Sequence, residues 1–505
     1  MTGKPTDKSA GETIGFVVSN EIGSRARKGA IWSAAQIITR NGLSLVVTAI
    51  LARILLPSDY GLVGMVTTLT ALLQVFADMG LSWATVRSQT LNRAQVSALF
   101  WINTAIGLLV WGLMAAAAPF LADFYNEPAI TQIAMVSGIS FLLSGIAVQP
   151  MALLIRQMNF RGSAIIEVTG LLVGAAVALG LALSGAGYWA LVAQLPVQAM
   201  VRAALAIRWS GIEIYAPRRT AGLGAMVSFG GLLVVNGIVI YLMRNLDSIL
   251  VAKVWGAAEL GFYNRAYFLM LLPSMLAASV LNHLMVSSLA NLQDDKPRFA
   301  NAYRRALRMV AYVGTPLALG LALTAGPAVG IVYGPGWEQV ATLLAWLSLA
   351  GITQPIYNTN GWLFIACGKA GLYLVTTVAN AIILCAVFFL TVEHDTIALA
   401  QGYGLVMGLI LPLPTLWLAH RAAGIAYLPS LRALLPVAVL NVAMGGVVWL
   451  IGAGSAALGW SALAAFPAQV VAGTALYLAL TPLLLPDMLS RDLAPVFNKF
   501  SSQVN

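Results

Sequence analysis

Residues 51–62 read LARILLPSDYGL, and the same pattern returns 200 positions later, without a gap, as VAKVWGAAELGF in residues 251–262. Each string follows one long apolar segment and precedes another. Matching positions carry identical or chemically similar residues: Ala52 and Ala252, Arg53 and Lys253, Ile54 and Val254, Asp59 and Glu259, Gly61 and Gly261. A repeat of this kind predicts a chain built from two related halves. When such halves consist of membrane helices, the arrangement is typical of a transporter whose substrate site lies between them.

The composition places most of the chain in a membrane. Hydrophobic residues make up 60% of the sequence and charged residues 9%, whereas a soluble domain has about 25% charged residues. Apolar runs recur that are long enough to cross a hydrocarbon core about 30 Å thick. We therefore predict an all-α polytopic membrane protein with about fourteen transmembrane helices, at 30–54, 60–83, 98–119, 129–155, 163–184, 187–208, 224–254, 264–288, 306–334, 338–366, 371–392, 396–420, 431–453 and 462–485.

The positions of lysine and arginine predict the orientation. Most of the 28 basic residues fall in the N-terminal tail and in alternate loops, while the opposite loops carry mainly Asp and Glu. Because basic residues concentrate in cytoplasmic loops, we expect both termini to be cytoplasmic. The net charge of +10 is then explained by contact with anionic membrane lipids, and it requires no nucleic acid.

The repeat extends beyond the duplicated strings. Gln149-Pro150 in predicted helix 4 has a counterpart, Gln354-Pro355, in predicted helix 10. Helices 1–6 then correspond to helices 7–12. Because six is even, both copies enter the membrane from the same side, so the pseudo-twofold repeat is parallel, with its axis along the membrane normal. The predicted organisation is a cytoplasmic tail (1–29), an N-lobe (30–208), a cytoplasmic linker (209–223), a C-lobe (224–420), two further helices (431–485) and a cytoplasmic C-terminal tail (486–505).

Polar side chains form one stripe on each of predicted helices 1 and 7. Their spacing of three or four residues places them on one helix face. At the offset of 200 positions, Gln36 corresponds to Asn236 and Ser44 to Arg244. We therefore predict that the two stripes line a central wet cavity that binds the substrate. The candidate residues are Arg40, Arg244, Gln36, Asn236, Ser44 and Asn245.

The arginines in these stripes are costly to bury. Arg40 lies about 15 Å along its predicted helix at 1.5 Å per residue, and an arginine at the bilayer centre costs about 2.5–3.5 kcal/mol on insertion scales. Such residues either line a functional cavity or form ion pairs inside the bundle, Arg40 with Asp78 and Arg244 with Asp247. The two aspartates are also candidates for gating or for coupling transport to a proton or cation.

Predicted helix 10 is unusually polar near its proline. Gln354, Asn358 and Asn360 surround a position where proline frees backbone carbonyls, which must find partners or face a cavity. This stretch is either a helix kink or a surface that faces a sugar.

Features expected of an enzyme are missing from the sequence. The 3 histidines and 2 cysteines are scattered and form no metal-ligand spacing. We find no nucleotide-binding motif and no catalytic constellation. We therefore expect a protein that is not an enzyme and has no metal or other cofactor.

The string NLDSILVAKVWGAAELGFYNRAYFLMLLP, residues 245–273, resembles the Wzx-type polysaccharide flippases of the multidrug/oligosaccharidyl-lipid/polysaccharide exporter superfamily, as do LARILLPSDYGLVG and ADMGLS. The resemblance covers residues 25–420. It implies two six-helix lobes and a substrate consisting of an oligosaccharide repeat unit on undecaprenyl pyrophosphate, moved between leaflets by alternating access for exopolysaccharide or lipopolysaccharide biosynthesis. It also implies that cationic cavity residues receive the pyrophosphate or acidic sugars, and only Arg40 and Arg244 match that description. A polysaccharide polymerase and export machinery are the implied partners.

Two alternatives remain open. A drug/cation antiporter of the same superfamily shares the architecture, since a fold does not fix the substrate, but it would favour an acidic cavity. A membrane-embedded polysaccharide polymerase would need a large outward loop or a carboxylate cluster.

Overall fold

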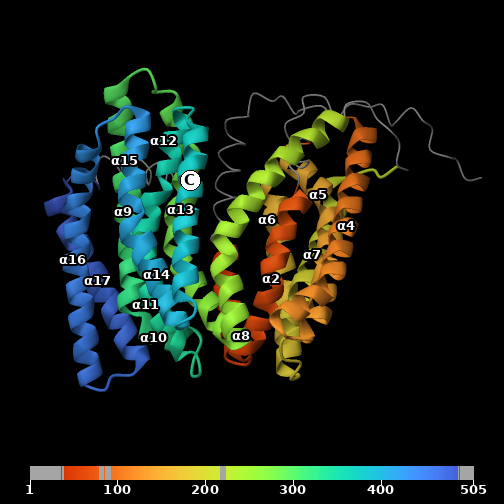
Figure 1. Cartoon of the computed structure of the whole chain (residues 1–505), viewed down its shortest axis with the longest axis horizontal. Helices are drawn as coiled ribbons and strands as arrows, with labels where there is room; N and C mark the ends of the chain where they lie inside the picture. The colour runs from red at the N-terminus through yellow and green to blue at the C-terminus, as the bar shows by residue number, and fades with distance from the viewer. Residues whose placement is uncertain are drawn as a thin grey trace, which may run out of the picture. The chain divides into compact units, whose positions relative to one another are not determined.

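The computed structural model describes residues 39–78, 92–215 and 223–486, together with Gln36, Thr85 and Met488. These residues are almost entirely helical (Figure 1). The helices are Thr39–Ala52, α2 (Pro57–Asp78), α4 (Arg93–Tyr125), α5 (Ala129–Arg156), α6 (Phe160–Leu183), α7 (Trp189–Ser210), α8 (Leu223–Ala290), α9 (Lys296–Leu323), α10 (Ala325–Val332), α11 (Glu338–Asn358), α12 (Asn360–Ala366), α13 (Ala370–Thr391), α14 (Thr396–Leu405), the π-helix η2 (Val406–Ile410), α15 (Pro412–Ala423), α16 (Tyr427–Ala457) and α17 (Ala462–Leu484).

The prediction of an all-α polytopic membrane protein is confirmed. Each of the fourteen predicted helices has a helical counterpart among the described residues, and 10 stretches are long and apolar enough to cross a membrane. Predicted helices 7 and 8 are the two parts of α8, which is interrupted by non-helical backbone at Gly256. Predicted helix 9 begins at Lys296 rather than at residue 306, because the Asp295 side chain caps the helix by accepting from the Arg298 N–H at 3.1 Å.

The chain divides by its internal contacts into two compact units, Met1–Gly261 and Phe262–Asn505. The first unit thus contains the part of α8 up to Gly261, although the repeat assigns predicted helix 7 to the C-lobe. The lobe and tail boundaries derived from the repeat stay a prediction.

In the first unit, α5 packs against α4 and α7, and α7 packs against α6. Glycines allow the backbones to approach closely. A Cβ atom at Gly107 of α4 would lie 2.5 Å from the Phe141 carbonyl oxygen, and one at Gly145 of α5 would lie 2.5 Å from the Asn103 carbonyl oxygen. Figure 1 shows α4 to α7 side by side in this unit.

The start of the predicted linker is bound to the beginning of α4. The Ser97 hydroxyl donates to the Tyr215 carbonyl at 2.9 Å and accepts from the Tyr215 N–H at 2.8 Å. Arg93 forms an ion pair with Glu213. The Tyr215 hydroxyl and Arg93 hold the pKa of the exposed Glu213 carboxyl below its usual range. The chain that leaves α7 therefore returns to the same end of the helix bundle.

In the second unit, α9 packs against α11 and α16, and α16 packs against α17. Buried hydrogen bonds attach the last two helices to α9. The Tyr477 hydroxyl donates to the Tyr312 carbonyl at 2.9 Å, and the Asn441 amide donates to the Thr315 hydroxyl at 2.8 Å. Predicted helices 13 and 14 are thus an integral part of this unit.

Candidate functional site

The first predicted polar stripe lies on the helix Thr39–Ala52 and the residues just before it. Arg40 is exposed, whereas Gln36 and Ser44 are half-buried. An exposed guanidinium on an otherwise apolar helix is available to bind an anion, because its five donors form a fixed fork that matches phosphate oxygens. The position of Arg40 is therefore compatible with the predicted role.

The second predicted stripe lies on the first part of α8. Asn236 and Arg244 belong to this helix, but their side chains lie outside the described residues. Asn245 is half-buried and its amide donates to the Tyr241 carbonyl at 3.0 Å. Asp247 is buried, with 3% of its surface exposed, and its carboxylate accepts from the Ser248 N–H at 2.7 Å. Asp247 is thus a buried carboxylate.

Asp78, the other candidate for gating or coupling, is the last residue of α2. Its side chain, and therefore its predicted pairing with Arg40, lies outside the described residues.

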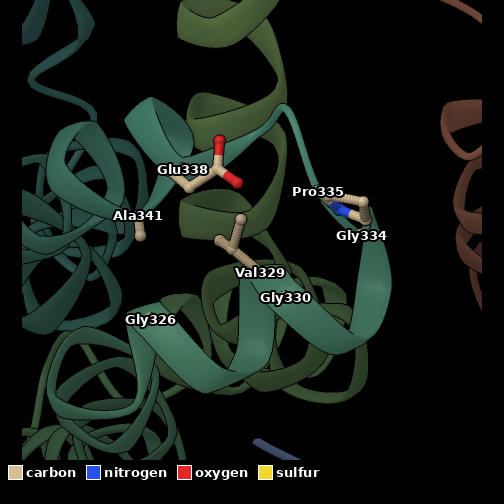
Figure 2. A pocket seen from close by; sticks show the side chains of 7 residues that line it. All are labelled: Gly326, Val329, Gly330, Gly334, Pro335, Glu338 and Ala341. Carbon is tan, nitrogen blue, oxygen red and sulfur yellow. The ribbon is translucent and has the colours of Figure 1, made fainter.

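A small cavity of about 200 Å³ lies in the second unit, at the turn between α10 and α11 (Figure 2). Its lining consists mainly of glycine and small apolar residues with one carboxylate: Gly326, Val329, Gly330, Gly334, Pro335, Glu338 and Ala341. The Glu338 carboxylate accepts from the Gly336 N–H at 3.0 Å, so it stabilises this turn. None of the predicted site residues lines this cavity, which therefore adds nothing to the candidate substrate site.

The polar stretch of predicted helix 10 contains a break. The helix ends at Asn358 and resumes at Asn360, three and five residues after Pro355. The Gln354 amide donates to the side-chain oxygen Oδ1 of Asn358 at 3.3 Å. Gln354 and Asn358 are half-buried, whereas Asn360 is only 2% exposed. The structure thus shows the interruption, and it leaves two of the three amide side chains partly accessible for the predicted sugar-facing role.

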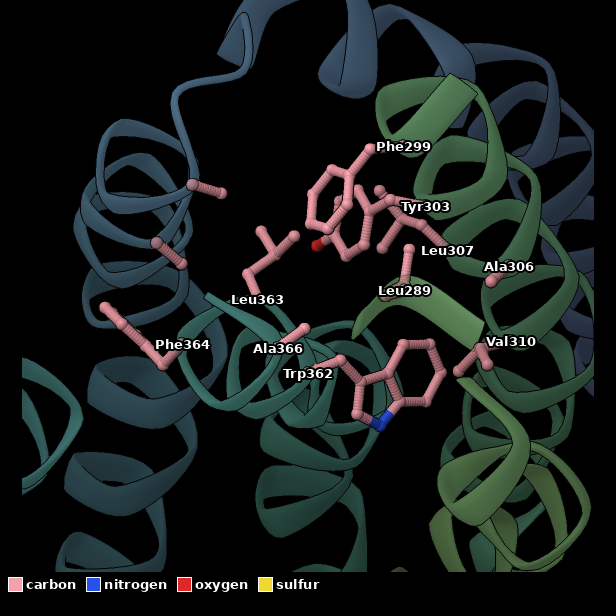
Figure 3. Close-up of a cluster of buried hydrophobic side chains, with 12 residues drawn as sticks. Leu289, Phe299, Tyr303, Ala306, Leu307, Val310, Trp362, Leu363, Phe364 and Ala366 are labelled. Atoms are coloured by element: carbon pink, nitrogen blue, oxygen red, sulfur yellow. The ribbon is translucent and has the colours of Figure 1, made fainter. Parts of the chain in front are cut away.

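The helix after the break is fixed by an apolar core (Figure 3). Trp362 and Leu363 of α12 pack with Phe299 and Leu307 of α9. The Tyr303 hydroxyl of α9 lies 2.9 Å from the Thr359 hydroxyl at the break. Neither amide atom of Asn360 has a hydrogen-bond partner among the described residues. The break is therefore a polar position enclosed by well-packed apolar side chains.

The two duplicated strings cross each other within the first unit. A Cβ atom at Gly61 would overlap the Ala257 carbonyl oxygen and lie 2.8 Å from the Ala257 Cα. Reciprocally, a Cβ atom at Gly261 would overlap the Pro57 carbonyl oxygen and lie 2.8 Å from the Pro57 carbonyl carbon. The two contacts are equivalent under the repeat, because Gly261 lies 200 positions after Gly61 and Ala257 lies 200 positions after Pro57. The backbones therefore touch at equivalent places in both copies, around a local pseudo-twofold axis.

The sequence alone did not identify this crossing. The matched glycines are visible in the sequence, but nothing in the sequence shows that the two backbones meet. One pattern in the sequence is consistent with a close helix crossing: a glycine follows four residues after Pro57 in the first copy and four residues after Ala257 in the second. This spacing puts both residues of each pair on one helix face.

Polar contacts flank the crossing. The Tyr241 hydroxyl donates to the Thr68 carbonyl of α2. The exposed Lys253 ammonium donates to the Phe124 carbonyl near the end of α4 and lies 4.8 Å from the centre of the Phe124 ring. A cation near the C-terminal end of a helix is stabilised by the helix dipole. The part of α8 that precedes Gly256 is therefore attached to both α2 and α4.

Comparisons with known proteins are consistent with these features. The family described as polysaccharide biosynthesis protein matches residues 50–342. The chain is 25% identical over 344 residues to the lipopolysaccharide biosynthesis protein WzxC of Escherichia coli, covering 67% of this chain and 69% of that protein. It is 28% identical over 331 residues to the succinoglycan biosynthesis transport protein ExoT of Rhizobium meliloti, covering 64% and 66%.

Among solved structures, the chain is similar to the lipid II flippase MurJ in an inward closed conformation. The TM-score is 0.72 at 13% sequence identity, and the match covers 91% of this chain and 99% of MurJ. At this identity the likeness shows the fold alone.

Proposed function

The chain belongs to the polysaccharide biosynthesis protein family, and from this premise we propose that it is a flippase for lipid-linked oligosaccharides. The resemblance to Wzx-type transporters is confirmed by relatives named for lipopolysaccharide biosynthesis and succinoglycan transport. The proposed substrate is an oligosaccharide repeat unit on undecaprenyl pyrophosphate. The protein moves it from the cytoplasmic to the periplasmic leaflet of a bacterial inner membrane, with both termini of the protein in the cytoplasm.

The family match over residues 50–342 is the observation that carries this proposal. The physical chemistry supports it, because a lipid-linked sugar has an apolar tail that can stay in the bilayer and a polar head that must be sheltered. A protein made of apolar helices with a few polar faces can provide that shelter while the two lobes alternate their access.

We assign the pyrophosphate to Arg40 and Arg244, with Gln36, Asn236, Ser44 and Asn245 beside them. Exposed Arg40 supports the assignment, since charge-assisted, bidentate hydrogen bonds to phosphate oxygens are among the strongest available to a side chain. Gln354 and Asn358 are assigned to the sugars.

Asp247 is the coupling candidate whose side chain lies among the described residues. A carboxylate buried inside a membrane helix is a functional candidate by default, and Asp247 is only 3% exposed. We propose that it takes up a proton or cation during the cycle, and that the exported units pass to a polysaccharide polymerase and its export machinery.

An antiporter of the same superfamily is the second candidate function. It would place acidic residues in the cavity. Asp247 is acidic but buried, and the charged residue exposed on the helix Thr39–Ala52 is the basic Arg40. This difference favours an anionic substrate.

The test is deletion of the gene followed by measurement of lipid-linked repeat units on each face of the inner membrane. The units should accumulate on the cytoplasmic leaflet in the deletion strain, and Arg40→Ala at normal abundance should produce the same accumulation. Arg298→Ala is the matched control, because Arg298 is an exposed arginine outside the stripe that pairs with Asp295. Undiminished export in the deletion strain contradicts the function, whereas export that survives both Arg40→Ala and Arg244→Ala contradicts the site.

A further inference from the structure

We propose that the cavity at the turn between α10 and α11 binds the headgroup of phosphatidylethanolamine, through the primary ammonium of that lipid. The short helix α10 and this turn connect α9 to α11, and both of these helices belong to stretches that are long and apolar enough to cross a membrane. A connection between two successive membrane spans lies at the level of the lipid headgroups. The proposal is independent of the proposed function, because a headgroup site needs no transported sugar.

The cavity carries a fixed negative charge. Glu338 is the first residue of α11, and its exposed carboxylate lines the cavity. The Gly336 N–H donates to this carboxylate at 3.0 Å and so holds it beside the turn. An ionised carboxylate has about four lone-pair positions, so it can accept further hydrogen bonds from a ligand. Figure 2 shows the side chains of Glu338 and Val329 directed toward the same space from two helices. This charge favours a cationic ligand.

The end of α10 favours a cation independently of Glu338. In a continuing helix the Gly334 N–H would donate to the Gly330 carbonyl, but here it donates to the Val329 carbonyl at 3.4 Å. Pro335, the next residue, has no N–H. The Gly330 carbonyl therefore has no backbone donor among the described residues, and it belongs to a residue of the cavity wall. The C-terminal end of a helix carries partial negative charge and stabilises a cation nearby.

The rest of the lining selects the kind of cation. Val329, Ala341 and glycines surround a space of about 200 Å³, and one water molecule takes about 30 Å³ in the liquid. An ammonium group on a two-carbon stem fits this space, with its methylene groups against the apolar side chains. Calcium takes about six to eight oxygen ligands, more than one carboxylate and one carbonyl supply. A sugar ring would bring several hydroxyl groups against apolar atoms that cannot hydrogen-bond them.

A surface for the rest of the lipid lies next to the cavity. The helix α17 packs against α10, and a Cβ atom at Gly330 would lie 3.9 Å from the Cβ of Ala462, the first residue of α17. The neighbouring Leu463 and Trp460 are exposed. Tryptophan is typical of the membrane–water interface, and an exposed leucine there can contact an acyl chain. This surface favours a phospholipid over a soluble amine or a lysine of another protein.

Capping of α11 is the competing explanation for Glu338. In that case the carboxylate only stabilises the turn, and the space beside it holds water. Glu338→Gln separates the two explanations, because the amide oxygen of glutamine can still accept from the Gly336 N–H while the negative charge is lost. The turn should therefore be kept in this variant, whereas binding of an ammonium should not.

The first experiment measures lipid binding by native mass spectrometry of the detergent-purified protein. Phosphatidylethanolamine and phosphatidylcholine with the same acyl chains are titrated separately. The ethanolamine lipid should bind about fivefold or more tightly, because the trimethylated nitrogen of choline donates no hydrogen bond to a carboxylate. Glu338→Gln should weaken binding of the ethanolamine lipid about fivefold or more and remove this preference, since it removes a hydrogen bond to a charged group.

Glu393→Gln is the matched control for this measurement. Glu393 is an exposed carboxylate in the turn between α13 and α14, which also connects two membrane spans, and it lines no part of the cavity. Its variant should bind both lipids as the unchanged protein does, and sites elsewhere on the protein contribute equally to all three. Equal affinity for the ethanolamine lipid in Glu338→Gln and Glu393→Gln overturns the proposal. Equal affinity of the unchanged protein for the two lipids also overturns it.

A second experiment fills the cavity and leaves its charge intact. Gly326→Leu places a side chain in the cavity, and a Cβ at this glycine meets nothing within 4 Å, so the variant should fold. Gly180→Leu is the control, since a Cβ at this glycine of α6 also meets nothing within 4 Å. A ligand that binds only the folded state raises the temperature of thermal unfolding. Added phosphatidylethanolamine should raise it in the control and less in Gly326→Leu, and equal increases overturn the proposal.

Discussion

The two copies of the duplicated segment reach the same crossing by different backbone routes. In the first copy the helix ends at Ala52, the chain turns over Arg53–Leu56, and α2 begins at Pro57. In the second copy α8 runs on, interrupted only where Gly256 adopts φ 80° and ψ −169°. Both breaks directly precede the residue whose carbonyl meets the opposite glycine. The comparison teaches that the position of the crossing is constrained, whereas the means of turning the chain is not.

Proline and glycine produce these breaks for opposite reasons. Pro57 fixes φ near −65° and lacks an N–H, so it is well suited to start a helix. The side chain of Asp59 accepts from the Leu56 N–H at 2.9 Å and supports that start. Gly256 instead occupies a region of φ and ψ that is essentially restricted to glycine.

Filling the crossing should have the largest effect. Gly61→Val or Gly261→Val places methyl groups against the opposite backbone, so the two strings cannot close. We expect export to fall about tenfold or more, since overpacking costs about 1–3 kcal/mol even where neighbours can move. Surface polysaccharide per cell, normalised to the amount of protein in the membrane, measures the loss. Gly180→Val is the matched control, and export by Gly61→Val equal to that of this control would contradict the need for a close crossing. Unequal losses in Gly61→Val and Gly261→Val would contradict the equivalence of the two copies.

Removing one arginine should have the next largest effect. Arg40→Ala should lower export about tenfold, because a hydrogen bond to a charged group contributes about 1.5–3 kcal/mol. Arg40→Lys should retain part of the activity, since it keeps the charge but loses the bidentate geometry. The same pair of variants at Arg244 shows whether the two copies share the pyrophosphate. If Arg40→Lys is as inactive as Arg40→Ala at equal abundance, bidentate geometry rather than charge is what the site requires.

Changing the turn itself should affect stability more in the second copy than in the first. Gly256→Ala places a side chain on a backbone conformation that is strained for any residue but glycine, which should lower the free energy of unfolding by about 1–3 kcal/mol. Pro57→Ala mainly raises the conformational entropy of the unfolded chain, which should lower the free energy of unfolding by about 0.4–1 kcal/mol. Thermal unfolding of the detergent-purified protein should therefore occur at a lower temperature for Gly256→Ala than for Pro57→Ala. The reverse order would show that the break at Gly256 is not required by the crossing.

The smallest expected effect concerns Lys253. Lys253→Met removes the ammonium that binds the Phe124 carbonyl and lies over the Phe124 ring. Because Lys253 is exposed, the loss should be about 0.5–1 kcal/mol. Thermal unfolding of the purified protein at low and high salt measures it. A larger loss than that of Gly256→Ala would mean that polar contacts, and not the backbone crossing, hold the strings together.

Much of the fold could be predicted because its determinants are local. Apolar length predicts each span, and proline, glycine and capping residues mark most ends, as Asp295 does for α9. The prediction of two separate helices, 7 and 8, is confirmed by the non-helical backbone at Gly256, but the shortness of the link between them could not be predicted, because residues 255–263 look like a loop in the sequence.

The candidate site was less predictable for a physical reason. Periodicity places Gln36, Arg40 and Ser44 on one face, but it does not say what packs against that face. Asn360 illustrates the limit, since it belongs to a polar stretch yet lies buried behind an apolar core. The crossing of the two strings could not be predicted, because it depends on the absence of a side chain at Gly61 and Gly261, and only the approach of the two backbones shows why the side chains are absent.

Reconstitution tests the central claim most directly. The purified protein is inserted into liposomes that carry a fluorescent undecaprenyl-pyrophosphate-linked oligosaccharide in both leaflets, and an impermeant quencher reports how much of it reaches the outer leaflet over time. The account predicts transfer between leaflets that is faster than in protein-free liposomes and slowed by Arg40→Ala. Transfer by the folded protein at the rate of protein-free liposomes would contradict it.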